Sequence, residues 1–181
     1  MVATNRRVDL IHERVDVALR VRTTLDTDAT LTVRTLARSR RILVASPEWA
    51  RRLGGEQALE SLASVPTLSS VEQAGQDVWV LVGPGQRTAT VRHEPRLACG
   101  DFLALREAAI AGLGVSLMPD HSCGAALCSG QLVRVFPDWH APDGMVHLVF
   151  TSRRGLPLPV EALIGHLAEH VRDALMWGEA T

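Results

Sequence analysis

The sequence predicts an α/β fold, and three features lead to that prediction. The first is residues 100–119, where Asp101 can cap a helix, Gly112 can end it in the left-handed conformation, and an apolar run follows at 115–118. That run is closed by Pro119 and is too short for another helix, so it is typical of a strand buried on both faces. The second feature is the alternation of strand-like and helix-like segments, and the third is an amphipathic helix that closes the chain.

The first half of the chain predicts short helices and strands joined by loops. Residues 15–21 alternate apolar with polar or small side chains, which is the period of a half-buried strand. Ser46, Pro47 and Glu48 are typical of a helix start, because Ser caps, Pro fits the first turn and Glu suits the positive end of the helix dipole. In chain order we expect a helix at 5–13, strands at 15–21, 31–36 and 42–45, helices at 46–54 and 56–63, and a hairpin of strands 78–82 and 88–92, with loops at 22–30 and 64–77.

The second half predicts the same alternation with longer helices. A strand at 96–99 enters the helix that Asp101 caps, and the buried strand 115–118 follows that helix. Apolar residues then recur at i, i+3, i+4 and i+7 in the closing segment, which predicts one core-facing helix face. After 118 we expect, in order, a helix at 121–129 ended by Gly130, strands at 132–136 and 146–150, and a helix at 159–177.

Composition excludes several classes of protein. The 181 residues are 46% hydrophobic, but no apolar run approaches the roughly 18 residues that a membrane span needs. The net charge of −1 disfavours a broad nucleic-acid-binding face. All 19 cationic residues are arginine, and without lysine a Walker-type phosphate loop or a Schiff-base enzyme is excluded. Because the start lacks the apolar core of a secretory signal, we expect a cytoplasmic protein without a membrane partner.

The cysteines predict neither a disulfide framework nor a metal site. There are three of them, an odd number, which fits a reducing compartment. Cys123 and Cys128 are five residues apart on the expected helix and point away from each other, so with His121 they lack zinc-knuckle geometry. We therefore expect these two thiols to be buried, and we expect no metal and no cofactor. Cys99 is also expected to be a small buried residue.

Four segments, in order, resemble the effector-binding domain of LysR-type transcriptional regulators, and together they span nearly the whole chain. These segments are residues 5–20, residues 41–49 (Arg-Ile-Leu-Val-Ala-Ser-Pro-Glu-Trp), residues 107–119, with Gly112, Gly114 and Pro119, and residues 130–139, which end in Phe-Pro-Asp-Trp. The resemblance implies two hinged Rossmann-like lobes similar to type II periplasmic binding proteins. It places lobe I at 1–39 and 137–181 and lobe II at 40–136.

The same resemblance implies that lobe I is incomplete at its N-terminal side. The helix-turn-helix through which the family binds DNA, its linker helix and the first strand-helix-strand of lobe I have no counterpart in the sequence. The chain is therefore expected to lack direct DNA binding and to be an N-terminally truncated domain. Strand 15–21 is then expected to lack a sheet neighbour and to expose apolar surface, so the chain is expected to be marginally stable or to associate, for example as a homodimer.

By the resemblance, a small effector is held in a cleft between the lobes without being transformed. Lobe II would contribute Gly100, Asp101 and Phe102 at one helix start and Ser46 at another, with both starts turned toward the same crevice. Lobe I would contribute Arg22, Thr23 and Thr24. Helix N-termini and a bidentate arginine suit an anion, so we expect an anionic or aromatic metabolite, with Ser46 or Arg22 as the better anion partner, because Asp101 opposes an anion at its own helix start.

Two other functions remain open at this point. His166, Glu169 and His170 match H-x-x-E-H, in which both imidazoles at i and i+4 can reach one zinc ion, and this would make the chain a metal-dependent hydrolase. Such patterns recur by chance on polar helix faces, and the third ligand of such enzymes lies, by resemblance, well downstream, where only Glu179 remains, so we favour a solvated face. A solute-binding protein of transport is disfavoured by the missing signal sequence. No nucleophile with a recognisable base is found, and we expect no enzyme activity.

Overall fold

The computed structural model describes residues 8–25, 30–54, 59–71, 75–151 and 156–175. Its described residues form two compact units. Of the described residues, 40–54, 59–71 and 75–142 belong to unit 1, and 8–25, 30–39, 143–151 and 156–175 belong to unit 2. The sequence predicts that the chain passes from lobe I to lobe II at 39/40 and returns at 136/137. In the structure it passes from unit 2 to unit 1 at Ser39/Arg40 and returns at Pro142/Asp143. Among the described helices, none is both long and apolar enough to cross a membrane.

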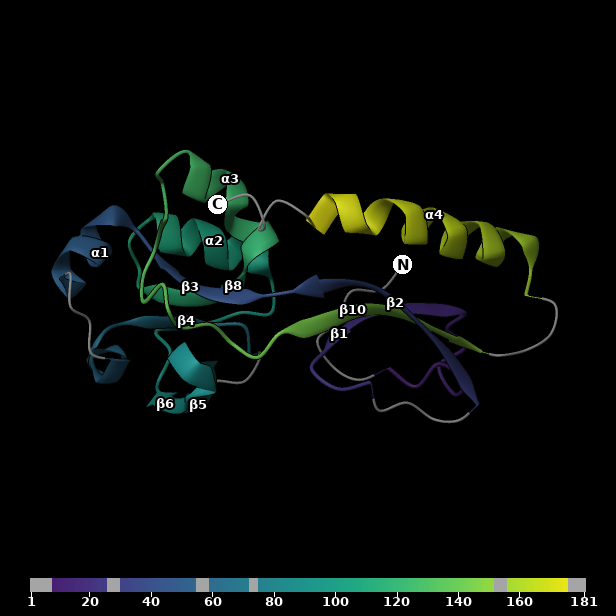
Figure 1. The fold of residues 1–181 in the computed structure, drawn as a ribbon, viewed down its shortest axis with the longest axis horizontal. Helices are drawn as coiled ribbons and strands as arrows, with labels where there is room; N and C mark the ends of the chain where they lie inside the picture. The colour runs from purple at the N-terminus through teal and green to yellow at the C-terminus, as the bar shows by residue number, and fades with distance from the viewer. Residues whose placement is uncertain (1–7, 26–29, 55–58, 72–74, 152–155, 176–181) are drawn as a thin grey trace. The chain divides into compact units, whose positions relative to one another are not determined.

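Unit 1 is built on a five-stranded mixed sheet with the strand order β7-β4-β8-β3-β9 (Figure 1). Strands β7, β4 and β8 run parallel to one another, whereas β3 is antiparallel to both β8 and β9. The strand bounds are β3 Arg41–Ala45, β4 Thr67–Ser69, β7 Leu97–Ala98, β8 Val115–Pro119 and β9 Val133–Arg134. The carboxyl ends of the three parallel strands therefore share one edge with the amino end of β3.

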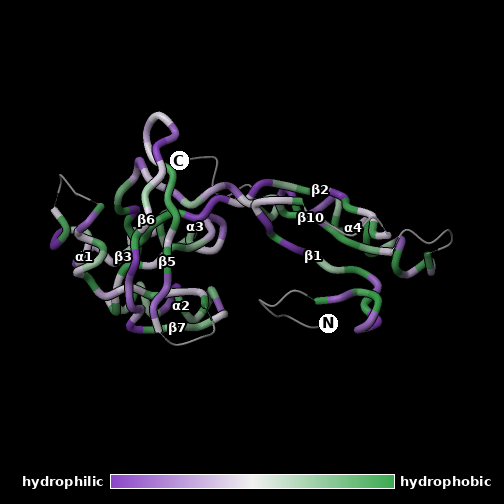
Figure 2. The backbone as a smooth tube through the Cα atoms, turned by 90° about the horizontal axis from the view of Figure 1, so that it is seen from below, coloured by the Kyte–Doolittle hydropathy of each residue, from purple (hydrophilic) through white to green (hydrophobic). Residues whose placement is uncertain are grey.

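Helices cover one face of this sheet and a hairpin covers the other (Figure 1). Helices α2, Phe102–Ile110, and α3, Asp120–Cys128, pack on a core that includes Ile42, Val44, Leu68, Leu105, Ala109 and Met118. The other face is covered by the hairpin strands β5, Asp77–Val82, and β6, Thr88–His93, together with helix α1, Pro47–Leu53, and the 3-10 helix η1, Leu59–Ser64. The core on this face includes Leu43, Ala45, Leu62, Trp79, Val115 and Leu117. The hairpin was expected, and it ends in a tip that is coloured hydrophilic in Figure 2.

Strand β8 confirms the expectation of a strand buried on both faces. Each of its residues is buried, and successive side chains enter opposite cores, with Leu117 in the hairpin-side core and Met118 in the helix-side core. Ser116 is its one hydroxyl side chain, and Ser116 Oγ donates to the carbonyl oxygen of Leu68 at 3.2 Å. Gly112, which ends the helix before β8, has the left-handed φ of 77° that was expected of it.

Three sequence predictions in unit 1 are wrong or need adjustment. The expected loop 64–77 contains β4, a three-residue strand that forms because β7 and β8 supply partners on both sides. The expected strand 132–136 shortens to β9, and Phe136 turns the chain away with a φ of 49°. Where a helix was expected at 56–63, the described residues form the 3-10 helix η1, and 56–58 lie outside the described residues.

Unit 2 is a three-stranded antiparallel sheet of order β1-β10-β2 with helix α4 on one face (Figure 1). Its elements are β1 Val17–Arg22, β2 Leu31–Ser39, β10 Gly144–Thr151 and α4 Leu158–Leu175. Leu36, Leu148 and Ile164 form its buried core, and Val17, Val160 and Leu167 pack around them. This is the core-facing pattern that the periodicity of the closing segment predicts, although 176–177 lie outside the described residues.

Strand β1 is the edge of that sheet, and one expectation about it is corrected. It does not lack a neighbour, since it pairs with β10 from Val17↔Phe150 to Arg22↔Met145. The expected exposure of apolar surface is present, because Leu19 is 51% exposed and Val21 is 46% exposed. β10 could not be assigned as the partner from the sequence, because more than a hundred residues separate the two strands.

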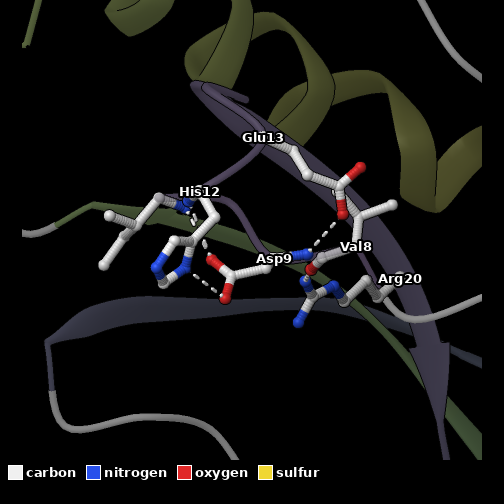
Figure 3. Close-up of polar contacts among 6 residues, drawn as sticks. Val8, Asp9, His12, Glu13 and Arg20 are labelled. Atoms are coloured by element: carbon white, nitrogen blue, oxygen red, sulfur yellow. Dashed lines mark hydrogen bonds and ion pairs between the residues drawn. The ribbon is translucent and has the colours of Figure 1, made fainter.

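The segment before β1 is a single turn where a helix was expected at 5–13 (Figure 3). Asp9 Oδ1 accepts from the amides of Ile11 and His12 at 3.0 Å each, and the Asp9 amide donates to Glu13 Oε1 at 3.0 Å. Arg14 has a φ of 55°, which ends the turn after one cycle. The Asp9 pKa is lowered because the His12 amide and imidazole both bond its carboxylate. Residues 5–7 of the expected helix lie outside the described residues.

Candidate functional site

The candidate site lies at the edge of the unit 1 sheet where β7, β4 and β8 end. Ser69 of β4 is level with Ala98 of β7, and Pro119 of β8 is level with Arg41 of β3. Carboxyl ends of parallel strands, with helices starting just beyond them, are where α/β proteins bind small ligands. This edge therefore has the right topology for a binding site.

Helix α2 begins at this edge, directly after β7. Asp101 is its N-cap, and Asp101 Oδ1 accepts from the Leu103 amide at 2.8 Å. The Cys99 amide donates to the Ser69 carbonyl oxygen at 3.0 Å, which ties the chain entering the helix to β4. Asp101 is exposed, whereas Gly100 and Phe102 are half-buried. The expected residues 100–102 thus lie together at the strand ends, where they offer an exposed carboxylate and a half-buried aromatic ring that packs against the helix-side core.

A buried polar cluster lies on the hairpin side of the same edge. Ser69 Oγ donates to Asp77 Oδ2, and Thr67 Oγ1 is 2.6 Å from His93 Nδ1. His93 Nε2 is 3.7 Å from Asp77 Oδ2, and the side chain of His93 is only 2% exposed. The Trp79 ring covers the imidazole, with 4.1 Å between the ring centroids. These five side chains link the open end of the hairpin to β4.

The charges at this edge are affected by burial. Burial lowers the pKa of His93, because the imidazolium form loses its water, and the Asp77 carboxylate opposes that shift. Burial also lowers the pKa of Arg41, at the amino end of β3, and Asp77 opposes this shift as well. Arginine keeps its charge even so. The edge therefore combines a fixed guanidinium and a carboxylate with an imidazole that burial keeps neutral at pH 7.

Ser46 lies at the opposite end of the strands, where it follows the carboxyl end of β3. It caps α1, where its Oγ accepts from the Trp49 amide at 3.4 Å, and Trp49 Nε1 donates to the carbonyl oxygen of Gly112 at 2.8 Å. Gly112 follows the end of α2, whereas Asp101 starts it, so the nine-residue helix, about 14 Å long, separates the two caps. The structure does not bring Ser46 and Asp101 to one crevice, because β3 runs antiparallel to β8.

Arg22, Thr23 and Thr24 belong to unit 2. Arg22 is the last residue of β1, where the sequence predicts the first residue of a loop, and its guanidinium donates to the Val21 carbonyl oxygen at 3.0 Å. Thr23 and Thr24 follow in a bend, and all three residues are exposed. Their part in effector binding stays a prediction.

The sequence analysis missed the buried polar cluster. Thr67 and Ser69 alternate with Leu68, which is a strand pattern, but three residues do not distinguish a strand from a loop. Asp77 and His93 pair across the hairpin, which follows from the predicted hairpin once its register is known. A hairpin register that puts an aspartate opposite a histidine at the open end was therefore the one available signal.

Comparison with known proteins identifies the family. Residues 1–172 match the family model described as the LysR substrate binding domain. The chain belongs to this family. This match confirms the resemblance that the four sequence segments indicate. It also confirms the expected fold class, a two-lobe fold like that of periplasmic binding proteins.

The relatives of this LysR domain are bacterial transcriptional regulators. It is 28% identical over 171 residues to the HTH-type transcriptional regulator PtxR of Pseudomonas aeruginosa, covering 94% of this chain and 54% of the relative. It is 29% identical over 171 residues to the HTH-type transcriptional regulator DmlR of Escherichia coli strain K12, covering 92% and 54%. The chain thus spans about half the length of the curated relatives it matches.

Solved structures of the family share the fold of this LysR domain. The regulatory domain of the AphB variant C227S from Vibrio vulnificus matches with a TM-score of 0.78 and 26% identity, over 93% of this chain and 80% of that one. Full-length AphB of Vibrio cholerae, a virulence activator, matches with a TM-score of 0.79 and 25% identity, over 92% of this chain and 56% of that one. The similarity therefore extends through both units.

The zinc motif does not form a metal site in the described part of this LysR domain. His166 and His170 stack with 4.2 Å between their ring centroids, and His170 Nδ1 lies 2.8 Å from the His166 carbonyl oxygen on α4. Among the described residues no three His, Cys, Asp or Glu side chains gather to hold a metal ion. The relatives are transcriptional regulators, so the hydrolase alternative gains no support.

The cysteines differ in burial, which corrects two expectations. Cys123 is buried as predicted, but Cys128, at the end of α3, is exposed, because five residues along a helix it points away from the core face that carries Cys123 and Ala126. Cys99, which was expected to be buried, is half-buried. Burial raises the pKa of the Cys123 thiol to about 12, and nearby Asp120 adds to the shift.

These environments predict selective thiol chemistry. In the folded protein near pH 8, iodoacetamide is expected to alkylate Cys128 while Cys123 stays unmodified, because Cys123 is both covered and held as the unreactive thiol. Peptide mass spectrometry with time would give the two rates, and the same reaction in urea is the control in which both cysteines react. Equal rates in the native protein would contradict the buried position of Cys123.

Proposed function

We propose that this LysR domain is the effector-sensing part of a transcriptional regulator, and that its effector binds at the carboxyl edge of the unit 1 sheet. One observation carries the proposal: Gly100, Asp101 and Phe102 start a helix where three parallel strands end, in a member of a substrate-binding family. Asp101 and Phe102 offer an exposed acceptor and a half-buried ring. Binding without transformation fits the relatives, which are transcriptional regulators.

The chemistry of this edge favours one of the two expected effector classes. An anion at the start of α2 would meet the carboxylate of Asp101, which already accepts from the Leu103 amide. An aromatic metabolite with hydrogen-bond donors would instead pair with Asp101 and pack on Phe102. We therefore propose an effector of this second kind, and Ser46 is left outside the proposal because it caps α1 at the other edge.

We also propose that the whole protein acts in the cytoplasm on DNA. The relatives are HTH-type regulators about twice as long as the matched region, so DNA binding would come from their additional part. Effector binding would then act by favouring one state of the regulator, by as much as its affinity differs between the states. Homodimer formation, and contacts from Arg22, Thr23 and Thr24, belong to the same proposal.

Thermal unfolding against a panel of metabolites would test the site. A true effector at about 100 times its Kd is expected to stabilise the domain by about 2.7 kcal/mol, which raises Tm by several degrees. Asp101→Asn keeps a good helix cap but removes the charge, so it is expected to weaken a donor-bearing effector at least about tenfold. Ser46→Ala is the matched control at the other cap and should bind normally. Loss of binding in Ser46→Ala but not in Asp101→Asn would overturn the proposal.

A further inference from the structure

The open end of the β5–β6 hairpin is fixed to the sheet through two residues that face each other across it. Asp77 is the first residue of β5, and it pairs directly with His93, the last residue of β6. Each of them forms a hydrogen bond with a residue on the same face of β4. The Asp77 carboxylate accepts from the Ser69 hydroxyl, and the His93 imidazole is hydrogen-bonded to the Thr67 hydroxyl. Two side-chain bridges thus connect the hairpin to the strand that ends at the candidate site.

The neutral form of His93 satisfies this arrangement best. We assign the tautomer with hydrogen on Nε2: Thr67 Oγ1 then donates to Nδ1, and the Nε2–H faces the Asp77 carboxylate at 3.7 Å. The other tautomer would point the Nε2 lone pair at a carboxylate. Adding a proton at Nδ1 turns that nitrogen into a donor, so Thr67 must change from donor to acceptor and its own hydrogen loses its acceptor. Protonation therefore breaks the pattern at the Thr67 bridge.

The surroundings decide whether protonation tightens or loosens the cluster. The Asp77 carboxylate favours the imidazolium, but Trp79 covers the ring and the burial of the ring outweighs that attraction, so the His93 pKa lies below its usual value. Arg41 on β3 acts on Asp77, and the charged residues on the elements around His93 are exposed: Arg92 on β6, Glu94 just after β6, Arg96, whose amide donates to the Thr67 carbonyl oxygen, and Glu60 on η1, which packs against β6. Because the unfolded chain accepts the proton more readily, acidification below about pH 6.5 weakens the folded form.

We propose that Thr67, Ser69, Asp77 and His93 form a proton-sensitive latch, in which neutral His93 holds the hairpin on β4 and protonated His93 releases it. The latch is next to the candidate site, because the Ser69 carbonyl oxygen accepts the Cys99 amide two residues before Asp101. A pH-dependent change in effector affinity would follow, and that consequence rests on the proposed function. The latch itself does not, since it can be measured without an effector.

Amide hydrogen exchange of the whole effector-free chain at about pH 7.5 and about pH 5.5 tests the latch. After correction for intrinsic exchange, protection of residues 77–93 is expected to fall by about threefold to tenfold on acidification. His93→Asn keeps an acceptor for Thr67 but cannot titrate, so its hairpin protection should not change. His147→Asn removes a buried histidine of unit 2, where His147 Nδ1 is 2.9 Å from the Met145 carbonyl oxygen, and should leave the hairpin response unchanged.

Two results would overturn the latch. One is an equal loss of protection in wild type and His93→Asn, or a loss spread evenly over both units. The other needs no variant and stands even if His93→Asn fails to fold: NMR titration of the His93 ring in the wild-type chain should give a pKa below the ordinary 6.5, and a value at or above it would refute the proposal.

Discussion

The Gly114→Ala variant is expected to lose about 3 kcal/mol of folding stability. A Cβ at this position would lie 2.3 Å from the carbonyl oxygen of Pro66 and 2.7 Å from its carbonyl carbon. Both are backbone atoms that cannot turn aside as a side chain can. The same Pro66 oxygen accepts the Val115 amide at 2.9 Å, where β4 and β8 begin to pair, so relief of the clash would also disturb the sheet. Urea unfolding followed by tryptophan fluorescence measures the loss, because Trp49, Trp79 and Trp139 all lie in unit 1.

Gly165→Ala is the matched control for Gly114→Ala. Gly165 lies inside α4, and an added Cβ there meets nothing within 4 Å. Alanine is the better helix former, so this variant is expected to stabilise unit 2 by about 0.5–1 kcal/mol, seen by circular dichroism at helix wavelengths. A Gly114→Ala variant as stable as wild type would mean that β4 does not approach β8 as closely as described.

The elements that were predicted correctly carry their information within a few neighbouring residues. Strand β8 is apolar and bounded by Gly114 and Pro119, the β5–β6 hairpin has its turn glycines, and α2 has Asp101 at its start and Gly112 beyond its end. Each of these signals acts through local backbone geometry or local burial. They suffice to place the helix start on which the candidate site is built.

The elements that were missed depend on residues far away in the sequence. Strand β4 has only three residues and exists because β7 and β8 pair with it on both sides. The separation of Ser46 from Asp101 depends on β3 running antiparallel to β8, and no local pattern specifies strand direction. The His93 cluster needs both the β4 position and the hairpin register, so it could not be assembled before the sheet was known.

The Leu105→Ala variant is expected to lose about 3 kcal/mol of folding stability. It tests how firmly α2, which begins at the candidate site, packs on the sheet. Leu105 is fully buried and packs in the helix-side core with Leu68 and Met118. Truncation removes apolar contact and leaves a cavity that the flanking strands can fill only in part. The urea midpoint of unit 1 should fall with an unchanged slope, since the folded and unfolded states stay the same.

Leu103→Ala on the same helix separates core packing from helix propensity. Leu103 is 56% exposed, and its amide, which donates to Asp101 Oδ1, is kept in the variant, so a cost below about 1 kcal/mol is expected. Similar losses of folding stability in Leu103→Ala and Leu105→Ala would contradict the described packing of α2 on the helix-side core. If Leu105→Ala also weakens an effector that Leu103→Ala binds normally, then the position of Asp101 depends on how firmly α2 is seated on Leu68, and the strand ends and the helix start act as one site.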